Sequence, residues 1–182
     1  GGARGGRRRG VDDGALGETV DQSHGSYSGA VLGGRYRIGK LLGTGGMGAV
    51  FEAEGPSGER VAVKVLSAVR GSDSDAQRRF VREVRASTSI QSPHVVRVIE
   101  ADADASRGVP FYAMELLHGR DVERLVRDGG PIEPAVAARI FMQAARGLSA
   151  AHARGVVHRD VKPANLFLHE PGDGSVVVKV CD

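Results

Sequence analysis

The segment His158-Arg159-Asp160-Val161-Lys162-Pro163-Ala164-Asn165 is the most informative part of this chain. Asn165 is the only asparagine among 182 residues, and it follows Asp160 by five positions. The segment brings together a carboxylate, an ammonium group and a carboxamide. The carboxylate can accept a proton from a hydroxyl, the ammonium can neutralise phosphate charge, and the carboxamide oxygen can hold Mg²⁺. This grouping suits phosphoryl transfer.

The use of lysine points to the same chemistry. The sequence contains 21 arginines but only four lysines, which are Lys40, Lys64, Lys162 and Lys179. In a chain so biased towards arginine, a lysine that tolerates replacement would be expected to appear as arginine. Lys64 and Lys162 lie in motifs where a compact ammonium must reach phosphate oxygens, a geometry that the guanidinium fork suits poorly. Lys40 and Lys179 are interpreted as chance survivors.

Composition narrows the classes of protein that fit. Hydrophobic residues make up 41% of the chain and charged residues 26%, with a net charge of +3, which is ordinary for one or two small soluble domains. The sequence pI near 9.3 reflects a dispersed arginine surplus, so no nucleic-acid partner is expected. Cys181 is the only cysteine, which excludes an internal disulfide and fits a reducing compartment. No apolar run is long enough to predict a membrane span.

The first part of the chain differs from the rest in composition. Residues 1–33 are rich in Gly, Arg, Ser and Asp without apolar periodicity, and they predict a disordered tail. Its run Arg7-Arg8-Arg9 could contact RNA or anionic lipid, but four acidic residues balance the four arginines and favour a solvated arm. The sequence does not begin with Met and stops inside a motif, so we expect a fragment that is open at both ends.

Hydrophobic patterning from residue 35 onwards predicts strands first and helices later. Strands are expected over residues 36–42, 49–54, 61–66, 95–99 and 110–116, with a helix over residues 74–90 between the third and the fourth. After Gly119, helices are expected over residues 121–127 and 134–152, followed by short strands over residues 166–168 and 176–180. The pattern therefore predicts an α+β fold, in which a five-stranded antiparallel sheet with one helix precedes a mostly helical part.

A glycine-rich motif lies between the first two predicted strands. The run Leu42-Gly43-Thr44-Gly45-Gly46-Met47-Gly48-Ala49-Val50 contains G-x-G-x-x-G-x-V, whose glycines let the backbone approach phosphate closely. A dinucleotide-binding fold uses similar glycines but opens a helix after the third. Here the chain continues as a strand and returns through a hairpin, which favours a flap over a nucleotide. The run from Gly34 to Lys40 resembles a Walker A loop only by coincidence, because Leu41 stands where Ser or Thr must hold Mg²⁺.

The motifs occur in the order and spacing of a known family. Together with Val61-Ala62-Val63-Lys64 and the Asp160–Asn165 loop, the glycine-rich flap resembles protein kinases, and in particular bacterial Hanks-type (eukaryotic-like) Ser/Thr kinases. The resemblance covers residues 34–182. It implies a bilobal protein-kinase-like fold, with an N-lobe at 34–117 and a truncated, partial C-lobe at 118–182 that ends at the D of a D-F-G motif.

The resemblance also implies an ATP site between the lobes. Lys64 would reach the α and β phosphates and would be held by an ion pair with Glu83. Met114 would be the gatekeeper, and the backbone of Glu115 and Leu117 would bond the edge of the adenine. The full set of implied nucleotide-binding residues is Leu42, Gly43, Thr44, Gly45, Gly46, Met47, Gly48, Val50, Ala62, Lys64, Met114, Glu115, Leu117 and Phe167.

The resemblance assigns the catalytic residues as well. Asp160 would position and deprotonate the acceptor hydroxyl, and His158 would brace the loop around it. Lys162, two residues after Asp160, is typical of kinases that act on Ser and Thr. Asn165 and Asp182 would hold the Mg²⁺ ions.

The expected function is ATP-dependent phosphoryl transfer to Ser/Thr hydroxyls of protein substrates, with autophosphorylation as one reaction open to such an enzyme. We expect a cytoplasmic kinase domain, in a parent protein that a segment outside this sequence could anchor to a membrane. The 182 residues alone are expected to be inactive, because the activation loop and the later C-lobe are missing.

Two other functions stay open at this point. The first is a pseudokinase, an ATP-binding or docking module. The second is a small-molecule phosphotransferase of related fold. The presence of Lys64, Glu83, Asp160 and Asn165 argues against the first, and the pair Lys162-Pro163 argues against the second.

Overall fold

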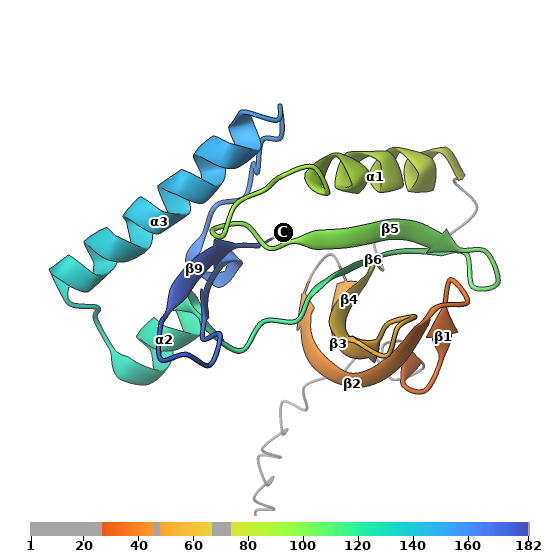
Figure 1. Cartoon of the computed structure of the whole chain (residues 1–182), viewed down its shortest axis with the longest axis horizontal. Helices are drawn as coiled ribbons and strands as arrows, with labels where there is room; N and C mark the ends of the chain where they lie inside the picture. Colours follow the sequence, from red (N-terminus) through yellow and green to blue (C-terminus); the bar gives the residue numbers. More distant parts are fainter. Residues whose placement is uncertain (1–26, 46–47, 67–73, 182) are drawn as a thin grey trace, which may run out of the picture.

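The structure is a computed structural model that describes residues 27–45, 48–66 and 74–181. Figure 1 shows two halves, with a large sheet and α1 in one half and α2, α3 and β9 in the other. The elements along the chain are β1 (Val31–Leu32), β2 (Tyr36–Gly45), β3 (Gly48–Glu54), β4 (Arg60–Leu66), α1 (Ser74–Ser87), β5 (Val98–Asp104), β6 (Val109–Glu115), β7 (Gly119–Asp121), α2 (Val122–Gly129), α3 (Pro134–His152), the 3-10 helix η2 (Pro163–Asn165), β8 (Leu166–His169) and β9 (Val177–Val180).

The first half is built on a six-stranded sheet with the order β1-β2-β3-β4-β6-β5, in which every neighbouring pair is antiparallel. The predicted five-stranded antiparallel sheet is confirmed in β2 to β6. The sixth strand, β1, pairs Leu32 with Tyr36 through a tight turn, in which Gly33 and Gly34 take the positive φ values of 56° and 68° that glycine adopts without strain.

The predicted tail extends too far into the fold. Tyr27 is only 4% exposed, and its ring meets that of Phe51 edge-on at 5.9 Å. Leu32 is completely buried in the same core. These residues belong to the core because their apolar side chains pack against the inner face of the sheet, whereas the composition of the stretch around them is polar. Residues 1–26 lie outside the described part of the chain.

Alternation along β4 separates the two faces of this sheet. Val61, Val63 and Val65 lie in the inner core with Phe51 and Phe111. Successive side chains of a strand point to opposite faces, so Ala62, Lys64 and Leu66 share the other face. Leu66 packs there against Val81 of α1, in a cluster that also contains Tyr112 and Met114 of β6. The face that carries Lys64 is therefore the face that α1 covers.

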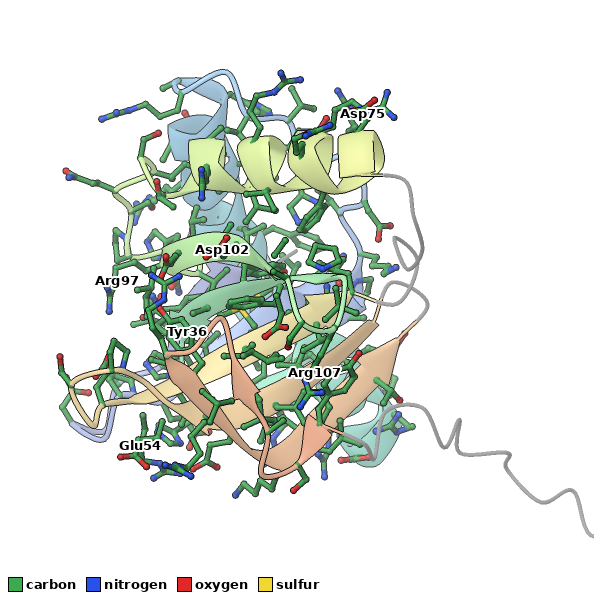
Figure 2. The ribbon with its side chains drawn as sticks, turned by 90° about the vertical axis from the view of Figure 1, so that its right-hand side faces the viewer. Tyr36, Glu54, Asp75, Arg97, Asp102 and Arg107 are labelled. Atoms are coloured by element: carbon green, nitrogen blue, oxygen red, sulfur yellow. The ribbon has the colours of Figure 1, made fainter. Side chains whose placement is uncertain are left out.

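The two ends of the six-stranded sheet are joined by polar side chains. Arg35, next to β2, forms ion pairs with Glu100 at 2.6 Å and with Asp102 at 2.7 Å, both on β5. The hydroxyl of Tyr36 donates to Glu100 at 3.0 Å. Figure 2 shows Tyr36 and Asp102 on the same side of the molecule, where the curled sheet brings β2 towards β5.

The second half contains α2, α3 and a three-stranded sheet with the order β7-β8-β9. The helix α3 spans Pro134–His152, as the sequence predicts, and Glu133 caps it by accepting a hydrogen bond from Val136 N. Its buried side chains Ile140 and Ala144 pack with residues of β8 and β9. Asp121 caps α2 in the same way. No helix in the described part of the chain is long and apolar enough to cross a membrane.

One predicted strand is displaced for a structural reason. The sequence predicts a strand over residues 95–99, whereas β5 begins at Val98. The preceding residues pair with the other half of the molecule instead. Val96 N donates to Val180 O at 2.9 Å, and Val180 N donates to His94 O at 2.9 Å. This segment therefore connects the two halves through β9, which lies between α3 and the large sheet (Figure 1).

Candidate active site

The loop before η2 is held in a defined shape by His158. Its Nδ1 accepts a hydrogen bond from Asp160 N at 3.3 Å, so Nε2 carries the proton and donates to Cys181 O at 2.8 Å. Arg159 lies between them with φ of 65°, the only positive value at a non-glycine residue in the described part of the chain. The expected brace at His158 is formed, and it ties the Asp160 loop to the residue that follows β9.

Asp160 lies at the surface of this loop with its carboxylate half exposed. Oδ2 contacts Lys162 Nζ at 2.8 Å and the side-chain amide of Asn165 at 3.2 Å. The hydrogen bond from Lys162 is the largest cause that lowers the pKa of Asp160 below its ordinary value of 3.8, and Asn165 adds to it. The carboxylate is therefore held in the ionised form that can accept a proton.

Asn165 is only 6% exposed at the end of η2. Its side-chain nitrogen donates to the backbone oxygen of Asp160 at 2.8 Å, and its backbone oxygen accepts from Cys181 N at 2.9 Å. No donor among the described residues bonds its Oδ1. A buried carboxamide oxygen without a donor is a suitable ligand for a hard cation such as Mg²⁺, so the site fits the metal that the resemblance implies. The second implied ligand, Asp182, lies outside the described residues.

Lys64 lies on the large sheet. It is 7% exposed on β4, opposite Val50 on β3 and Tyr112 on β6. Ala62, two residues earlier on the same face, is opposite Met114. The structure thus places Val50, Ala62, Lys64 and Met114 on one face of three adjacent strands.

The glycine-rich flap forms the end of β2 and the start of β3. Leu42, Gly43, Thr44 and Gly45 are all exposed, and a Cβ added at Gly43 or Gly45 would meet nothing within 4 Å. Gly48 has φ of 151°, and a Cβ there would lie 2.0 Å from Val65 O, so this position requires glycine for the strand pairing itself. Gly46 and Met47 lie outside the described residues.

The predicted ion pair between Lys64 and Glu83 is not formed in the structure. The Glu83 side chain is exposed and forms no hydrogen bond or ion pair with any described residue. The helix α1 is oriented by Phe80, Val81 and Val84, which pack against the sheet, and this orientation leaves Glu83 on the flank of the helix. The sequence identifies the helix but not its rotation relative to β4.

The end of β6 and the residues after it form the connection between the halves. Glu115 N donates to Arg97 O at 3.0 Å, so this amide is already bonded within the protein. The backbone of Leu117 makes no hydrogen bond within the described part of the chain, so its N–H and C=O can bond a ligand. Phe167 is half-buried on β8 in the second half, opposite Asp121 and Lys179.

Sequence reasoning missed one residue beside this site. Lys179 on β9 is 8% exposed, and its Nζ lies 2.7 Å from Glu115 Oε1. The interpretation of Lys179 as a chance survivor is therefore wrong. The arginine bias that singled out Lys64 and Lys162 was a signal for Lys179 too, because a buried ammonium in a small space is not readily replaced by a guanidinium.

One cavity lies away from these residues. A cavity of about 500 Å³ opens on the surface of β2 to β4, where its lining includes Arg37, Glu52 and Arg60. It does not contain any of the predicted site residues. No group of three or more His, Cys, Asp or Glu side chains that could hold a metal occurs in the described ranges.

Comparison with known proteins agrees with this geometry. Residues 36–182 match the protein kinase domain family. The chain is 38% identical over 156 residues to a probable serine/threonine-protein kinase of Corynebacterium efficiens, a match that covers 84% of this chain and 23% of that protein. It is 42% identical over 136 residues to the serine/threonine-protein kinase PknE of Mycobacterium bovis, which covers 74% of this chain and 24% of that protein. The chain thus spans about a quarter of the length of these relatives.

Solved structures give the same result. The PknI kinase domain of Mycobacterium tuberculosis superimposes with a TM-score of 0.71 and 29% sequence identity, over 85% of this chain and 61% of that one. A double mutant of the same domain gives a TM-score of 0.72. With a family match over residues 36–182 and relatives that are bacterial serine/threonine kinases, the chain belongs to the protein kinase domain family.

Proposed function

We propose that the protein containing this chain transfers a phosphoryl group from ATP to Ser or Thr hydroxyls of protein substrates. The observation that carries the proposal is the arrangement of Asp160, Lys162 and Asn165. An exposed carboxylate with a lowered pKa lies beside an ammonium group and beside a buried carboxamide, whose oxygen no donor in the described part of the chain bonds. Relatives that are serine/threonine kinases support the choice of acceptor.

The proposed roles divide the site between a base, cations and a nucleotide platform. Asp160 orients the acceptor hydroxyl and takes its proton, while Lys162 contributes positive charge near the transferred group. Lys64 contacts the phosphates of the nucleotide from the large sheet. Asn165 and Asp182 hold Mg²⁺, which when bound neutralises charge on the phosphates. Phosphoryl transfer has a loose transition state, so these positions and charges contribute more than the base.

The adenine would lie between the two halves. Ala62 leaves room for the ring, Val50 covers it from the large sheet, and Phe167 supports it from β8. The open backbone groups of Leu117 would bond the edge of the ring, with the carbonyl of Glu115. The exposed residues Leu42 to Gly45, together with Gly46, Met47 and Gly48, would close over the phosphates as a flap.

Substrate and location form part of the same proposal. The protein substrates carry Ser or Thr acceptors, and autophosphorylation is included among the reactions. We propose a cytoplasmic position for this domain, where ATP is available, with any anchor in another part of the protein. The 182 residues alone are expected to transfer no phosphoryl group, because this chain covers only 61% of a solved kinase domain.

The decisive experiment uses the full-length protein and the substitution Asp160→Asn. The variant keeps the size of the side chain and its contact with Asn165 but removes the base. We expect transfer from radiolabelled ATP to a generic Ser/Thr substrate to fall by about 10²-fold or more, while the dissociation constant of ATP with Mg²⁺ stays close to that of the wild type.

A matched control uses another carboxylate. Asp173 lies between β8 and β9, and its carboxylate bonds only the neighbouring Ser175 among the residues that the structure describes, so Asp173→Asn should leave transfer unchanged. A wild-type protein that binds ATP without transferring its phosphoryl group would favour the docking module instead. Equal loss of binding and transfer in Asp160→Asn would contradict the role assigned to this residue.

A further inference from the structure

A buried ion pair joins the two halves of the molecule next to the proposed nucleotide site. Lys179 Nζ lies 2.7 Å from Glu115 Oε1, with the two side chains only 10% and 21% exposed. The residues are separated by 64 positions in sequence. Lys179 belongs to the three-stranded sheet, whereas Glu115 is the last residue of β6 in the six-stranded sheet. The pair is therefore a direct side-chain link between the two sheets.

The Glu115 end of this link is fixed to the connection between the halves. The same oxygen, Oε1, accepts a hydrogen bond from Arg97 N at 2.7 Å, and Glu115 N donates to Arg97 O at 3.0 Å. Glu115 is thus held by its backbone and by its side chain at once. The groups proposed to bond the base are the carbonyl of Glu115 and the backbone of Leu117, two residues further along the chain.

The Lys179 end is fixed to the strand that leads to the metal ligands. Lys179 is opposite Phe167 in the β8–β9 pairing, and β8 begins directly after Asn165. Cys181 follows Lys179 by two residues. Its N donates to Asn165 O at 2.9 Å, and its O accepts from His158 Nε2 at 2.8 Å. A shift of β9 would therefore move Asn165 and the loop that carries Asp160 together.

We propose that Lys179 and Glu115 form a positioning pair, which sets the separation between the base-binding backbone after β6 and the metal-binding end of β9. This inference rests on the proposed function. A rigid separation matters because a nucleotide that is held at its base must present its phosphates at a fixed distance from the metal ligands. Lys179 touches neither the nucleotide nor the metal in this scheme, and it acts through Asn165, which Cys181 bonds at the end of β9.

A positioning pair and a purely structural pair should affect two binding measurements differently, namely the affinity for adenosine and the gain in ATP affinity on adding Mg²⁺. Adenosine reports on the base-binding backbone alone, whereas the gain in ATP affinity on adding Mg²⁺ reports on the metal-binding end of β9. Substituting a residue that orients metal ligands typically costs about 10- to 100-fold in metal affinity or activity. A positioning pair should therefore affect the Mg²⁺-dependent gain much more than the binding of adenosine.

The experiment compares Lys179→Met with the wild type in the full-length protein. Dissociation constants are measured by calorimetry for adenosine and for ATP, the latter with Mg²⁺ and with EDTA, and are corrected for the folded fraction. For Lys179→Met we expect the Mg²⁺-dependent gain to fall by about tenfold or more while adenosine affinity stays close to the wild type. Lys179→Arg keeps the charge and should recover part of the gain.

Removal of one partner leaves the other charge buried, which can destabilise the protein by itself. The double variant Lys179→Met with Glu115→Gln avoids that problem, because the amide oxygen can still accept from Arg97 N. We expect it to fold like the wild type and still to lack the gain. The matched control is Lys40→Met, which breaks the ion pair of the exposed Lys40 with Glu52 at 3.2 Å, away from the proposed site, and should leave the gain unchanged.

Three results would overturn the inference. One is an undiminished gain in folded Lys179→Met, and another is a gain restored in the double variant. The third is a parallel loss of adenosine and ATP binding, which would make the pair structural only. A wild-type protein that shows no Mg²⁺-dependent gain would overturn the proposed function and this inference together. Failure of the inference alone would instead appear only in the variants, with a normal gain in the wild type.

Discussion

The side-chain amide of Asn165 bonds both the backbone oxygen of Asp160, at 2.8 Å, and its carboxylate, at 3.2 Å. The two polar atoms of this side chain, which belongs to the only asparagine in the chain, can therefore serve different roles. Its nitrogen shapes the loop that presents Asp160, and we propose that its oxygen binds a cation. Neither aspartate nor glutamine can do both, because the first lacks the donor and the second is one methylene longer.

Replacement of Asn165 by Asp should destabilise the fold in a pH-dependent way. The new carboxylate would be buried and would face two acceptor oxygens of Asp160, so we expect the free energy of unfolding to fall by about 1–3 kcal/mol at neutral pH. The deficit should shrink as the pH is lowered, because the buried carboxyl can then take up a proton and donate. Urea denaturation followed by circular dichroism at two pH values measures this. A deficit that grows in acid would contradict the geometry.

The substitution Lys162→Met should raise the pKa of Asp160. The hydrogen bond from Lys162 is the main cause that lowers this pKa below 3.8, so its loss should return the value towards the ordinary range, with Asn165 still lowering it. Titration of the Asp160 carboxyl carbon by NMR measures the change, and Lys40→Met serves as the control. Because the folded pKa is depressed, the stabilisation linked to this group is present above pH 3.8 and is lost as the pH falls through the folded pKa. In Lys162→Met this acid-dependent loss should be smaller.

Ionisation of Tyr36 should lower the stability of the fold at the opposite, alkaline end of the pH range. Burial, followed by the hydrogen bond to Glu100, raises the pKa of Tyr36 from 10.0 to about 12. The folded state therefore keeps a proton that the unfolded state releases, so the stabilisation is complete below pH 10 and is lost as the pH rises from 10 to 12. In Tyr36→Phe this part of the alkaline loss should disappear. At neutral pH the variant should lose about 1 kcal/mol, the usual contribution of one hydrogen bond.

Chemical denaturation at several pH values between 8 and 12 tests the prediction for Tyr36, with Tyr27→Phe as the comparison for a second buried tyrosine. An alkaline loss of stability that is the same in Tyr36→Phe and in the wild type would show that Tyr36 ionises equally in both states.

The parts of the fold that sequence predicts are those with local chemical signals. The order of strands and helices follows from alternation and from helical periodicity, and the bounds of α3 follow from Pro134 at its start and the apolar face along it. The glycine-rich flap and the Asp160–Asn165 loop are identified by residue types at short, fixed spacings. The roles assigned to individual site residues stay predictions until they are tested.

The parts that sequence does not predict depend on contacts between distant segments. The strand β7 has only three residues, and it exists because β8 offers a partner. Glu83 is found on the expected helix, but the rotation of that helix is set by Phe80, Val81 and Val84. Lys179 has no local motif, and its partner is 64 positions away. Composition alone pointed to it, through the scarcity of lysine.

Gly147 provides a test of how closely α3 approaches the segment that connects the halves. In an ordinary helix, Gly→Ala is expected to stabilise the protein by about 1 kcal/mol because alanine has the higher helix propensity. Here a Cβ at Gly147 would lie 2.3 Å from His94 O, the carbonyl that accepts from Val180 N. We therefore expect Gly147→Ala to destabilise the protein by about 1–3 kcal/mol, as overpacking does, and to disturb β9 as well.

Thermal and urea denaturation measure the stability of Gly147→Ala, with Ser149→Ala as the control at an exposed position of the same helix. Ser149→Ala should be neutral or slightly stabilising, because it changes helix propensity without a close neighbour. Hydrogen exchange of Val180 N should quicken in Gly147→Ala and not in Ser149→Ala, because only the first displaces the carbonyl that this amide bonds. If Gly147→Ala instead stabilises the protein by the amount that propensity predicts, the helix must be able to move away from His94, and the link from α3 to β9 through this segment would not be rigid.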